Sequence, residues 1–339
     1  MPIRRSANRT LVNFLSALNN QMLEDFQVLA IPTKTNFRGI NLREVVIFHG
    51  PFGYSEFSPF VEYSKNESKN WMRAAIEAAY KPKPELRKSK VKINATLPKV
   101  DLDKVKNILD LYPGAKTIKI KVDSFVEDAK LVSKALEYAP SAQIRLDVNG
   151  GWDLQRAREN IEKFDHEFGS HIEYYEQPCA DLSELKKLKE ITKSKIAADE
   201  SIRKNLDFKF EELSEYVDIA ILKWQPVGGF NAACELAEKI KLPVVISSAL
   251  ETGIGVGLGL HLAASIGTEL ACGLGTVGLL EADIVNEPLE IIDGEIAVIS
   301  RTPNQEQIAK YRASEERWFW WKKRVEEVLG SGDFDEYFN

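Results

Sequence analysis

Cysteine and histidine are scarce in this sequence: its 339 residues include three cysteines and four histidines. Three scattered cysteines argue against a disulfide framework and favour a reducing compartment, here the cytoplasm. The four histidines do not lie at the spacing of metal ligands, so a zinc site is not expected. A metal in this protein would therefore be held by carboxylates, which favours a hard divalent cation such as Mg²⁺.

Long apolar runs and an excess of positive charge are also missing. No run approaches the roughly 20 apolar residues that a membrane span needs. The N-terminal segment 1–20 has neither a long apolar core nor a small-residue cleavage site, so we interpret it as ordinary chain and not a signal peptide. The net charge of -6 and the lack of a basic stripe argue against a nucleic-acid partner. We expect a small-molecule partner and no membrane partner, and both a monomer and a homo-oligomer stay open.

Short apolar runs alternate with polar, helix-forming stretches from residue 91 onward. Marker residues in successive runs recur at intervals of roughly 25 residues, the length of one strand-plus-helix unit. Eight such units predict an α/β fold of the (β/α)8 type, a TIM-like barrel, with a doubly wound open sheet as the alternative. The markers are Lys121, Asp147, Glu176, Asp199, Lys223, Ser247 and Cys272.

The two ends of the chain lack this period. Residues 1–90 are predicted to form the N-terminal part of an α+β capping domain, residues 91–284 the barrel, and residues 285–339 a segment that packs back on both. A hairpin is expected over 42–60, with Gly50 and Pro51 in its turn, and a helix over 68–80.

The C-terminal segment is predicted to begin with a second hairpin over 289–300, turning at Asp293 and Gly294. Residues 306–329 are predicted to be helical. The aromatic run from Trp318 to Trp321 is expected to pack the tail onto the body of the protein, and a dimer contact is the alternative.

Two lysines share one face of the second barrel run, Thr117 to Val122, because side chains alternate along a strand. If the isoleucines between them face the helices, Lys119 and Lys121 point into the barrel. Neighbouring ammonium groups lower each other's pKa, so one of the pair could act as a general base. The alternative is an edge strand with solvated lysines.

The next three runs each end near an acidic residue: Asp147, Glu176 and Asp199. Three carboxylates converging at the carboxyl ends of adjacent strands would repel one another, and a divalent cation, Mg²⁺ or Mn²⁺, would resolve that repulsion. Each acid taken alone could instead be a helix N-cap.

Lys223 ends the sixth run, which lies opposite the second run in an eight-stranded barrel. Lys121 and Lys223 would then face each other across the mouth, with the metal to one side. This arrangement suits abstraction of a proton alpha to a carboxylate, with the cations stabilising the enolate-like intermediate.

Five ordered motifs resemble the muconate-lactonizing-enzyme subgroup of the enolase superfamily. They are Lys119-Ile120-Lys121, Asp147-Val148-Asn149, Glu176-Gln177-Pro178, Asp199-Glu200-Ser201 and Lys223. The resemblance implies that Lys121 is a base assisted by Lys119, and that Lys223 lies on the opposite face of the substrate. It also implies that Asp147, Glu176 and Asp199 ligate the metal in a modified barrel with a cap.

Within this subgroup the chain resembles the o-succinylbenzoate synthases most, in segments such as residues 53–60, 94–96, 247–253 and 273–276. That resemblance implies a hydro-lyase of menaquinone biosynthesis, which removes water from a succinyl-hydroxycyclohexadiene carboxylate. N-acylamino acid racemase, dipeptide epimerase and muconate-type cycloisomerase are the alternatives on the same scaffold. A silent barrel that only binds partners would have lost catalytic positions, and a Schiff-base aldolase would not need three carboxylates.

Candidate substrate-binding residues lie outside the catalytic set. Arg38 could grip a carboxylate from the cap, or it could form a surface salt bridge. Ser247 and Ser248 could bind the succinyl carboxylate or cap the following helix. Asn149 and Gly275 belong to the resembling segments and complete the set. The glycine-rich stretch 253–259 is not interpreted as a nucleotide loop, because it follows the seventh run and lacks an acidic partner.

Overall fold

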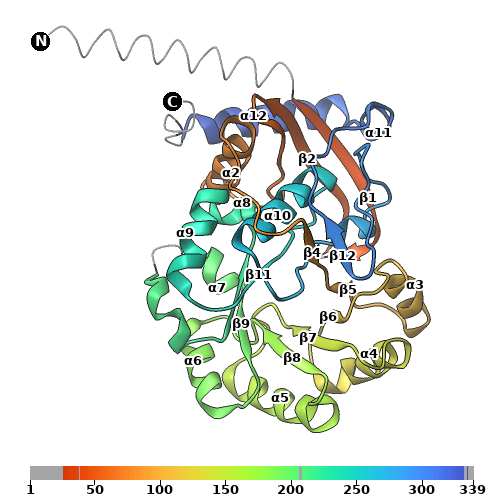
Figure 1. The fold of residues 1–339 in the computed structure, drawn as a ribbon, viewed down its shortest axis with the longest axis vertical. Coiled ribbons are helices and arrows are strands. Elements are labelled where there is room, and N and C mark those ends of the chain that lie inside the picture. The colour runs from red at the N-terminus through yellow and green to blue at the C-terminus, as the bar shows by residue number, and fades with distance from the viewer. Residues whose placement is uncertain (1–25, 38, 206–207, 332–333, 335–339) are drawn as a thin grey trace, which may run out of the picture.

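A computed structural model describes residues 26–37, 39–205, 208–331 and 334 of the protein (Figure 1). The expectations for the first 20 residues and for Arg38 fall outside these ranges. No described helix is both long enough and apolar enough to cross a membrane. The chain folds into a barrel and a cap that is built from both ends of the sequence.

The barrel contains seven parallel strands that are hydrogen-bonded in the order of the sequence. Residues 272 and 273 fill the eighth position: Cys272 N donates to Lys92 O at 2.7 Å, and Gly273 N donates to Ile246 O at 2.9 Å. Bridges on both sides therefore close the ring, and the predicted barrel is confirmed with a very short eighth strand. The strands are β5 (Ala95–Leu97), β6 (Thr117–Lys121), β7 (Gln143–Asp147), β8 (Ile172–Glu176), β9 (Ile196–Ala198), β10 (Ile219–Leu222) and β11 (Val244–Ile246).

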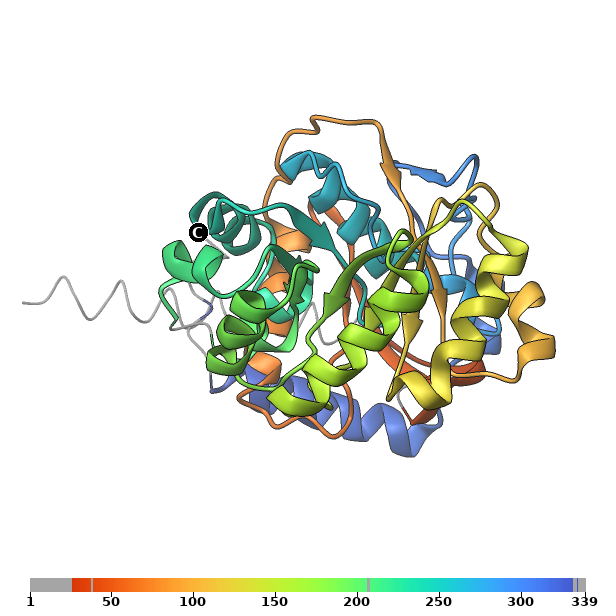
Figure 2. The same cartoon turned by 90° about the horizontal axis from the view of Figure 1, so that it is seen from below.

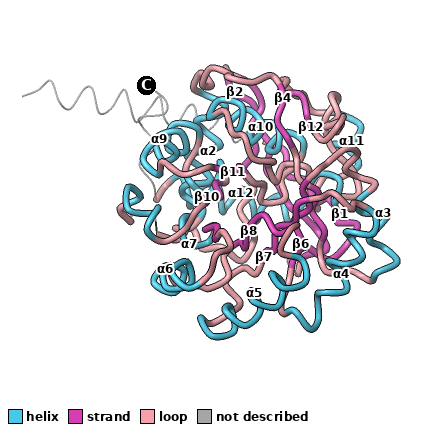
Figure 3. The backbone as a smooth tube through the Cα atoms, turned by 60° about the horizontal axis from the view of Figure 1, so that its bottom comes forward, coloured by secondary structure: helices cyan, strands magenta, loops and turns pink. Residues whose placement is uncertain are grey.

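Helices surround these strands (Figures 2 and 3). Their ends are set locally: Ser124 accepts from Glu127 N at the start of α4, and Asp153 accepts from Arg156 N at the start of α5. The apolar faces of the longer helices pack on the strands in the main hydrophobic core. The helices are η1 (Leu102–Lys104), α3 (Val105–Leu109), α4 (Phe125–Tyr138), α5 (Leu154–Phe168), α6 (Leu182–Ile191), α7 (Glu200–Arg203), η2 (Phe210–Glu215), α8 (Trp224–Val227), α9 (Phe230–Ile240), α10 (Gly253–Ile266) and η3 (Thr276–Leu279).

The cap is an antiparallel sheet of three strands covered by helices from both chain ends (Figure 1). Its N-terminal elements match the predicted hairpin and helix. Trp321 is fully buried, and its ring meets that of Phe57 edge to face at 6.0 Å, while Phe319 stays 56% exposed. The aromatic tail thus packs on the body, as predicted. The elements are β1 (Gln27–Phe37), β2 (Ile40–Gly50), β3 (Gly53–Phe57), α2 (Ser68–Tyr80), α11 (Gln305–Lys310) and α12 (Glu315–Leu329).

The predicted second hairpin is wrong in its pairing. Asp293 and Gly294 do form a tight turn with positive φ, but only Ile292 and Glu295 are bridged across it. The strand that follows, β12 (Glu295–Ala297), pairs instead with β4 (Lys90–Lys92), which leads into the barrel. The turn is fixed by the barrel itself, since Ile93 N donates to Gly294 O at 2.8 Å. Tertiary hydrogen bonds outcompete the local pairing here.

Candidate active site

A cavity of about 280 Å³ lies at the carboxyl ends of the barrel strands, where the cap covers them. Active sites of (β/α)8 barrels gather at this end of the strands. Strands β6, β7, β8, β10 and β11 lie together at the centre of Figure 3, inside the ring of helices. The lining residues are Phe60, Tyr63, Trp71, Lys119, Lys121, Asp147, Asn149, Asp199, Glu200, Arg203, Lys204, Lys223, Pro226, Ser247, Ser248 and Ala249.

The alternation along β6 points both lysines into the barrel, as predicted. Ile118 and Ile120 are buried in the core between strands and helices, while Lys119 and Lys121 line the cavity. Charged side chains inside a barrel need partners, because burial without them is costly.

Lys119 has such partners. Its ammonium lies 3.0 Å from Asp147 Oδ2 and 2.9 Å from Glu176 Oε1. Burial lowers the pKa of Lys119, but the charges of Asp147, Glu176 and Asp199 outweigh it and raise this pKa well above its ordinary value. The lowered pKa expected from two neighbouring ammonium groups is therefore not found at Lys119, because the acids dominate its surroundings.

Lys121 differs from Lys119 and Lys223, the two other cavity lysines that lie on or directly after a barrel strand. It is half-buried, and within the described ranges no carboxylate lies at ion-pair distance from its ammonium. In the register of β6 and β7, Lys121 pairs with Asp147. Lys121 is thus the lysine whose nitrogen is left to face a ligand.

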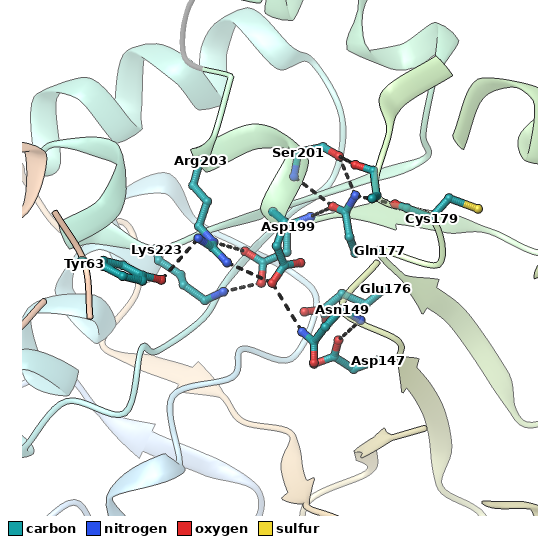
Figure 4. A network of polar contacts seen from close by, with 12 residues as sticks. Tyr63, Asp147, Asn149, Glu176, Gln177, Cys179, Asp199, Ser201, Arg203 and Lys223 are labelled. Carbon is teal, nitrogen blue, oxygen red and sulfur yellow. Dashed lines mark hydrogen bonds and ion pairs between the residues drawn. The ribbon is translucent and has the colours of Figure 1, made fainter. Parts of the chain in front are cut away.

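The three predicted acids lie at neighbouring strand ends. Asp147 and Glu176 are direct partners in the register of β7 and β8, and Asp199 follows β9 (Figure 4). The N-cap alternative fails for Asp199: it occupies the first position before α7, yet its side chain accepts no helix N–H. Its carboxylate accepts instead from Lys223. Within the described residues, Asp147 and Glu176 likewise bond to Lys119 and cap no helix.

Lys223 and Arg203 both pair with the carboxylate of Asp199 (Figure 4). Lys223 follows β10, four places from β6 around the ring, so the predicted opposition of Lys121 and Lys223 matches the order of strands. Arg203 Nε lies 3.7 Å from Asp199 Oδ1, and its Nη1 lies 3.4 Å from the hydroxyl of Tyr63 in the cap. Because Lys223 is ion-paired with Asp199, the two facing lysines, Lys121 and Lys223, have different chemical surroundings.

Gln177 is a functional residue that sequence reasoning left without a role. Its side-chain oxygen accepts from Asp199 N at 2.9 Å and from Ser201 N at 3.0 Å, and its amide donates to Cys179 O at 2.8 Å (Figure 4). These bonds tie the end of β8 to the start of α7 and so fix Glu176 relative to Asp199. The signal was present, since Gln177 and Ser201 stand inside two of the quoted motifs.

A metal ion fits the chemistry of this donor set. In the described part of the chain no three acidic, histidine or cysteine side chains are grouped closely enough to hold a metal as they stand, because Lys119 lies between two of the acids. Burial raises the pKa of Glu176 to about 7, opposed by Lys119 and reinforced by Asp147 and Asp199. Three carboxylates at neighbouring strand ends are ligands that a hard divalent cation prefers.

The two serines of the 247–253 segment have different surroundings. Ser247 lines the cavity, and within the described residues its hydroxyl has no hydrogen-bond partner. The hydroxyl of Ser248 donates to Glu251 Oε2 at 2.6 Å and accepts from Thr276 Oγ1 at 2.7 Å and Leu250 N at 2.8 Å. Ser248 also touches the cavity, but its hydroxyl is already committed to the protein.

The other predicted binding residues divide as well. Asn149 lines the cavity and donates to Glu200 Oε1 at 3.4 Å. Gly275 does not line it: a Cβ there would lie 2.7 Å from Tyr112 Cε1, so its role is close packing. Arg38 lies outside the described residues. The sequence reasoning missed Arg203, Lys204, Tyr63 and Trp71, which no motif marked, and it gave no role to Phe60, which ends the segment 53–60.

Comparison with known proteins places this site in a family. Residues 103–303 match the family described as enolase C-terminal domain-like, and residues 28–79 match the one described as enolase N-terminal domain-like. The muconate lactonizing enzyme of Pseudomonas fluorescens with bound muconolactone has the same fold, with a TM-score of 0.70 at 18% identity over 85% of this chain and 98% of that one. The chain belongs to the enolase superfamily.

Curated relatives narrow the assignment. An o-succinylbenzoate synthase of Mycolicibacterium smegmatis is 40% identical over 321 residues, which cover 93% of this chain and 98% of the relative. One of Mycobacterium tuberculosis is 40% identical over 310 residues, covering 90% and 93%. Within the superfamily, the chain belongs to the o-succinylbenzoate synthase family.

Proposed function

We propose that this protein dehydrates 2-succinyl-6-hydroxy-2,4-cyclohexadiene-1-carboxylate to 2-succinylbenzoate in menaquinone biosynthesis, and that it works in the cytoplasm. The observation that carries the proposal is the inequality of the two facing lysines. Among the described residues Lys121 has no acidic partner, whereas Lys223 is ion-paired with Asp199. One base and one fixed cation are what an elimination needs, whereas a racemase needs two exchangeable bases.

Lys121 takes the proton alpha to the ring carboxylate on its Nζ, and the electron pair of the broken C–H bond moves toward that carboxylate. The C–O bond then breaks as the electron pair forms the double bond that completes the aromatic ring, and the hydroxyl leaves as water with the proton that Lys121 has taken. Lys223, held by Asp199 on the other face, stabilises the developing charge and contacts the ring face as a cation. Lys119 is a positioning residue that keeps Asp147 and Glu176 together.

Asp147, Glu176 and Asp199 would hold the divalent cation, Mg²⁺ or Mn²⁺. When bound, it supplies positive charge beside the substrate carboxylate and makes the alpha proton more acidic. Asn149 and Ser247, which face the cavity, would donate hydrogen bonds to substrate oxygens.

The charges of the cavity support a doubly anionic substrate. Five cationic side chains line it against three acidic ones, and the buried Glu176 beneath adds a fourth acid. A divalent cation would leave the cavity clearly positive, which attracts a dicarboxylate. The cations are Lys119, Lys121, Arg203, Lys204 and Lys223, and the lining acids are Asp147, Asp199 and Glu200.

Turnover of the cyclohexadiene substrate by the magnesium-loaded protein tests the proposal. We expect the ultraviolet absorbance of the aromatic product to grow, and chelation of the metal to stop it. No turnover, together with racemisation of N-acylamino acids at useful rates, would refute the proposal.

Racemisation is the second candidate, since Lys121 and Lys223 lie on strands across the ring. Proton exchange in deuterium oxide distinguishes the two activities. With a racemase, deuterium from the solvent enters both enantiomers of an amino-acid derivative. A dehydratase with one competent base exchanges one enantiomer much faster than the other.

A further inference from the structure

A second cavity, of about 320 Å³, lies away from the strand ends. It is enclosed by the turn between β2 and β3, the segment that follows α2, one face of α10 and residues 298–302. Helix α10 lies between the cap strands and β4 in Figure 1. None of the residues that line this cavity is acidic. They are His49, Phe52, Gly53, Tyr54, Lys83, Leu86, Ile254, Gly257, Leu258, His261, Val298, Ile299, Ser300, Arg301 and Thr302.

Arg301 is a buried cation without a carboxylate partner. It is 7% exposed, and its guanidinium donates only to the backbone oxygens of Ile299 at 3.1 Å and Ala297 at 3.3 Å. Its Nε has no hydrogen-bond partner within the described residues, and no carboxylate oxygen there lies at ion-pair distance. Burial lowers the pKa of Arg301, and the charges of Asp283 and Glu287, which act from beyond ion-pair distance, only partly oppose it. Buried arginines are normally paired, because an isolated buried charge is costly.

Lys83 is the second cation of this cavity. It donates to Phe52 O at 2.7 Å, and no described carboxylate pairs with it. Burial lowers the pKa of Lys83 and also that of His261, whose Nε2 lies 2.8 Å from Pro84 O. His261 is therefore neutral near neutral pH, and the positive charge of the cavity comes from Lys83 and Arg301.

The rest of the lining is mainly apolar. Ile254, Gly257, Leu258 and His261 follow one another on one face of α10 at the spacing of helical turns. Gly257 keeps the space beside the guanidinium open, since a Cβ there would lie 3.3 Å from Arg301 Nη1. Large apolar side chains at the rim stay exposed, at 47% for Phe52, 44% for Leu86 and 49% for Ile299.

We propose that this cavity binds a small aromatic carboxylate, independently of the catalytic cavity. The carboxylate would pair with Arg301 and Lys83, and the ring would cover the apolar face of α10 and Phe52. A phosphate would leave that apolar surface bare, and a neutral aromatic molecule would leave the buried guanidinium unpaired. The volume suits a ligand of benzoate to succinylbenzoate size. This inference does not depend on the proposed function.

Fluorine NMR of para-fluorobenzoate added to the magnesium-loaded protein tests this site. We expect saturable binding that weakens at least tenfold in Arg301→Met and in Gly257→Leu. The second variant fills the space without changing a charge. Arg158→Met removes the same charge from an exposed position on α5 and should bind like the unaltered protein.

A further variant distinguishes binding in this second cavity from binding in the catalytic cavity. Asp199→Asn should leave the binding that depends on Arg301 within twofold of the unaltered protein. Equal affinity in Arg301→Met and Arg158→Met would overturn the proposal. So would complete displacement of the probe by equimolar inorganic phosphate, or loss of the Arg301-dependent signal in Asp199→Asn. Thermal unfolding serves as the folding control. If Arg301→Met and Gly257→Leu unfold at temperatures close to that of the unaltered protein, their loss of binding is not caused by a loss of folding.

Discussion

The two walls of the catalytic cavity are built on different principles. The barrel wall consists of charged groups held in ion pairs between neighbouring strands, such as Lys119 with Asp147 and Lys223 with Asp199. The cap-facing wall consists of Phe60, Tyr63 and Trp71, joined by Ser247, whose hydroxyl has no hydrogen-bond partner in the part of the chain that the structure describes. The difference teaches that the barrel carries the chemistry, while the cap shapes what can enter.

Buried glutamates of the cap join the two walls. Glu56 in β3 accepts from Thr252 N and Gly255 N, each at 3.1 Å, at the start of α10. Glu77 in α2 accepts from Phe230 N at 2.6 Å at the start of α9. Each glutamate thus accepts from backbone N–H groups at the start of a barrel helix from another part of the chain, where the helix dipole favours negative charge. The cap is therefore fixed to the two barrel units that carry Lys223 and Ser247.

The largest effect is expected on the barrel wall from Lys121→Ala. Loss of the base should lower kcat at least about 1,000-fold, because general base catalysis contributes effects of that size. Circular dichroism and thermal unfolding should be unchanged, since Lys121 forms no ion pair with any residue that the structure describes. The exposed Lys130→Ala is the matched control. A kcat within tenfold of the unaltered protein would contradict the assignment.

Asp199→Asn should weaken Mg²⁺ binding at least about 100-fold, because changes to residues that only support a metal ligand already cost 10–100-fold. Calorimetric titration with magnesium measures this affinity. Asp181→Asn, an exposed acid at the start of α6, should bind the ion normally. Unaltered affinity in Asp199→Asn would remove this residue from the metal site.

Glu56→Gln probes the junction between the walls. Burial and the nearby Glu251 raise the pKa of Glu56 from 4.5 to about 7. The folded state therefore binds a proton that the unfolded state has released, and stability falls as the pH rises through this window. At a pH above this window, the loss in the free energy of unfolding reaches about 3 kcal/mol, at roughly 1.4 kcal/mol per pKa unit.

Glutamine does not titrate, so this part of the pH dependence should be missing from Glu56→Gln. Urea unfolding at about pH 5 and about pH 8 measures it in both proteins. The exposed Glu62→Gln should keep the dependence of the unaltered protein. Parallel pH profiles for Glu56→Gln and the unaltered protein would show that Glu56 does not titrate in this range.

The smallest effects are expected on the cap-facing wall, from the two serines. Ser247→Ala should raise KM about fivefold with little change in stability, as loss of one hydrogen bond is worth about 1 kcal/mol. Ser248→Ala should instead lower stability by about 1–3 kcal/mol, because the buried Leu250 N and Thr276 Oγ1 lose their acceptor and Glu251 loses one of its buried donors. Steady-state kinetics and urea unfolding of both variants measure the contrast. The opposite pattern would reverse the assigned roles.

Much of the architecture could be predicted because it rests on short-range rules. Strand alternation in β6 and the regular unit length depend only on local geometry, and so do the start and end of α2. The second hairpin failed for the opposite reason. Its turn at Asp293 and Gly294 is local, but the partner of β12 is β4, far away in the sequence.

The sequence by itself determined the barrel, the strand ends that carry Lys121, Asp147, Glu176, Asp199 and Lys223, and the family to which they point. Only the tertiary structure decided which of these groups are paired. Lys119 and Lys121 are two residues apart, yet the acids of β7 and β8 reach only Lys119. Pairing, burial and free hydrogen-bond capacity depend on neighbours from distant segments, so no local pattern encodes them.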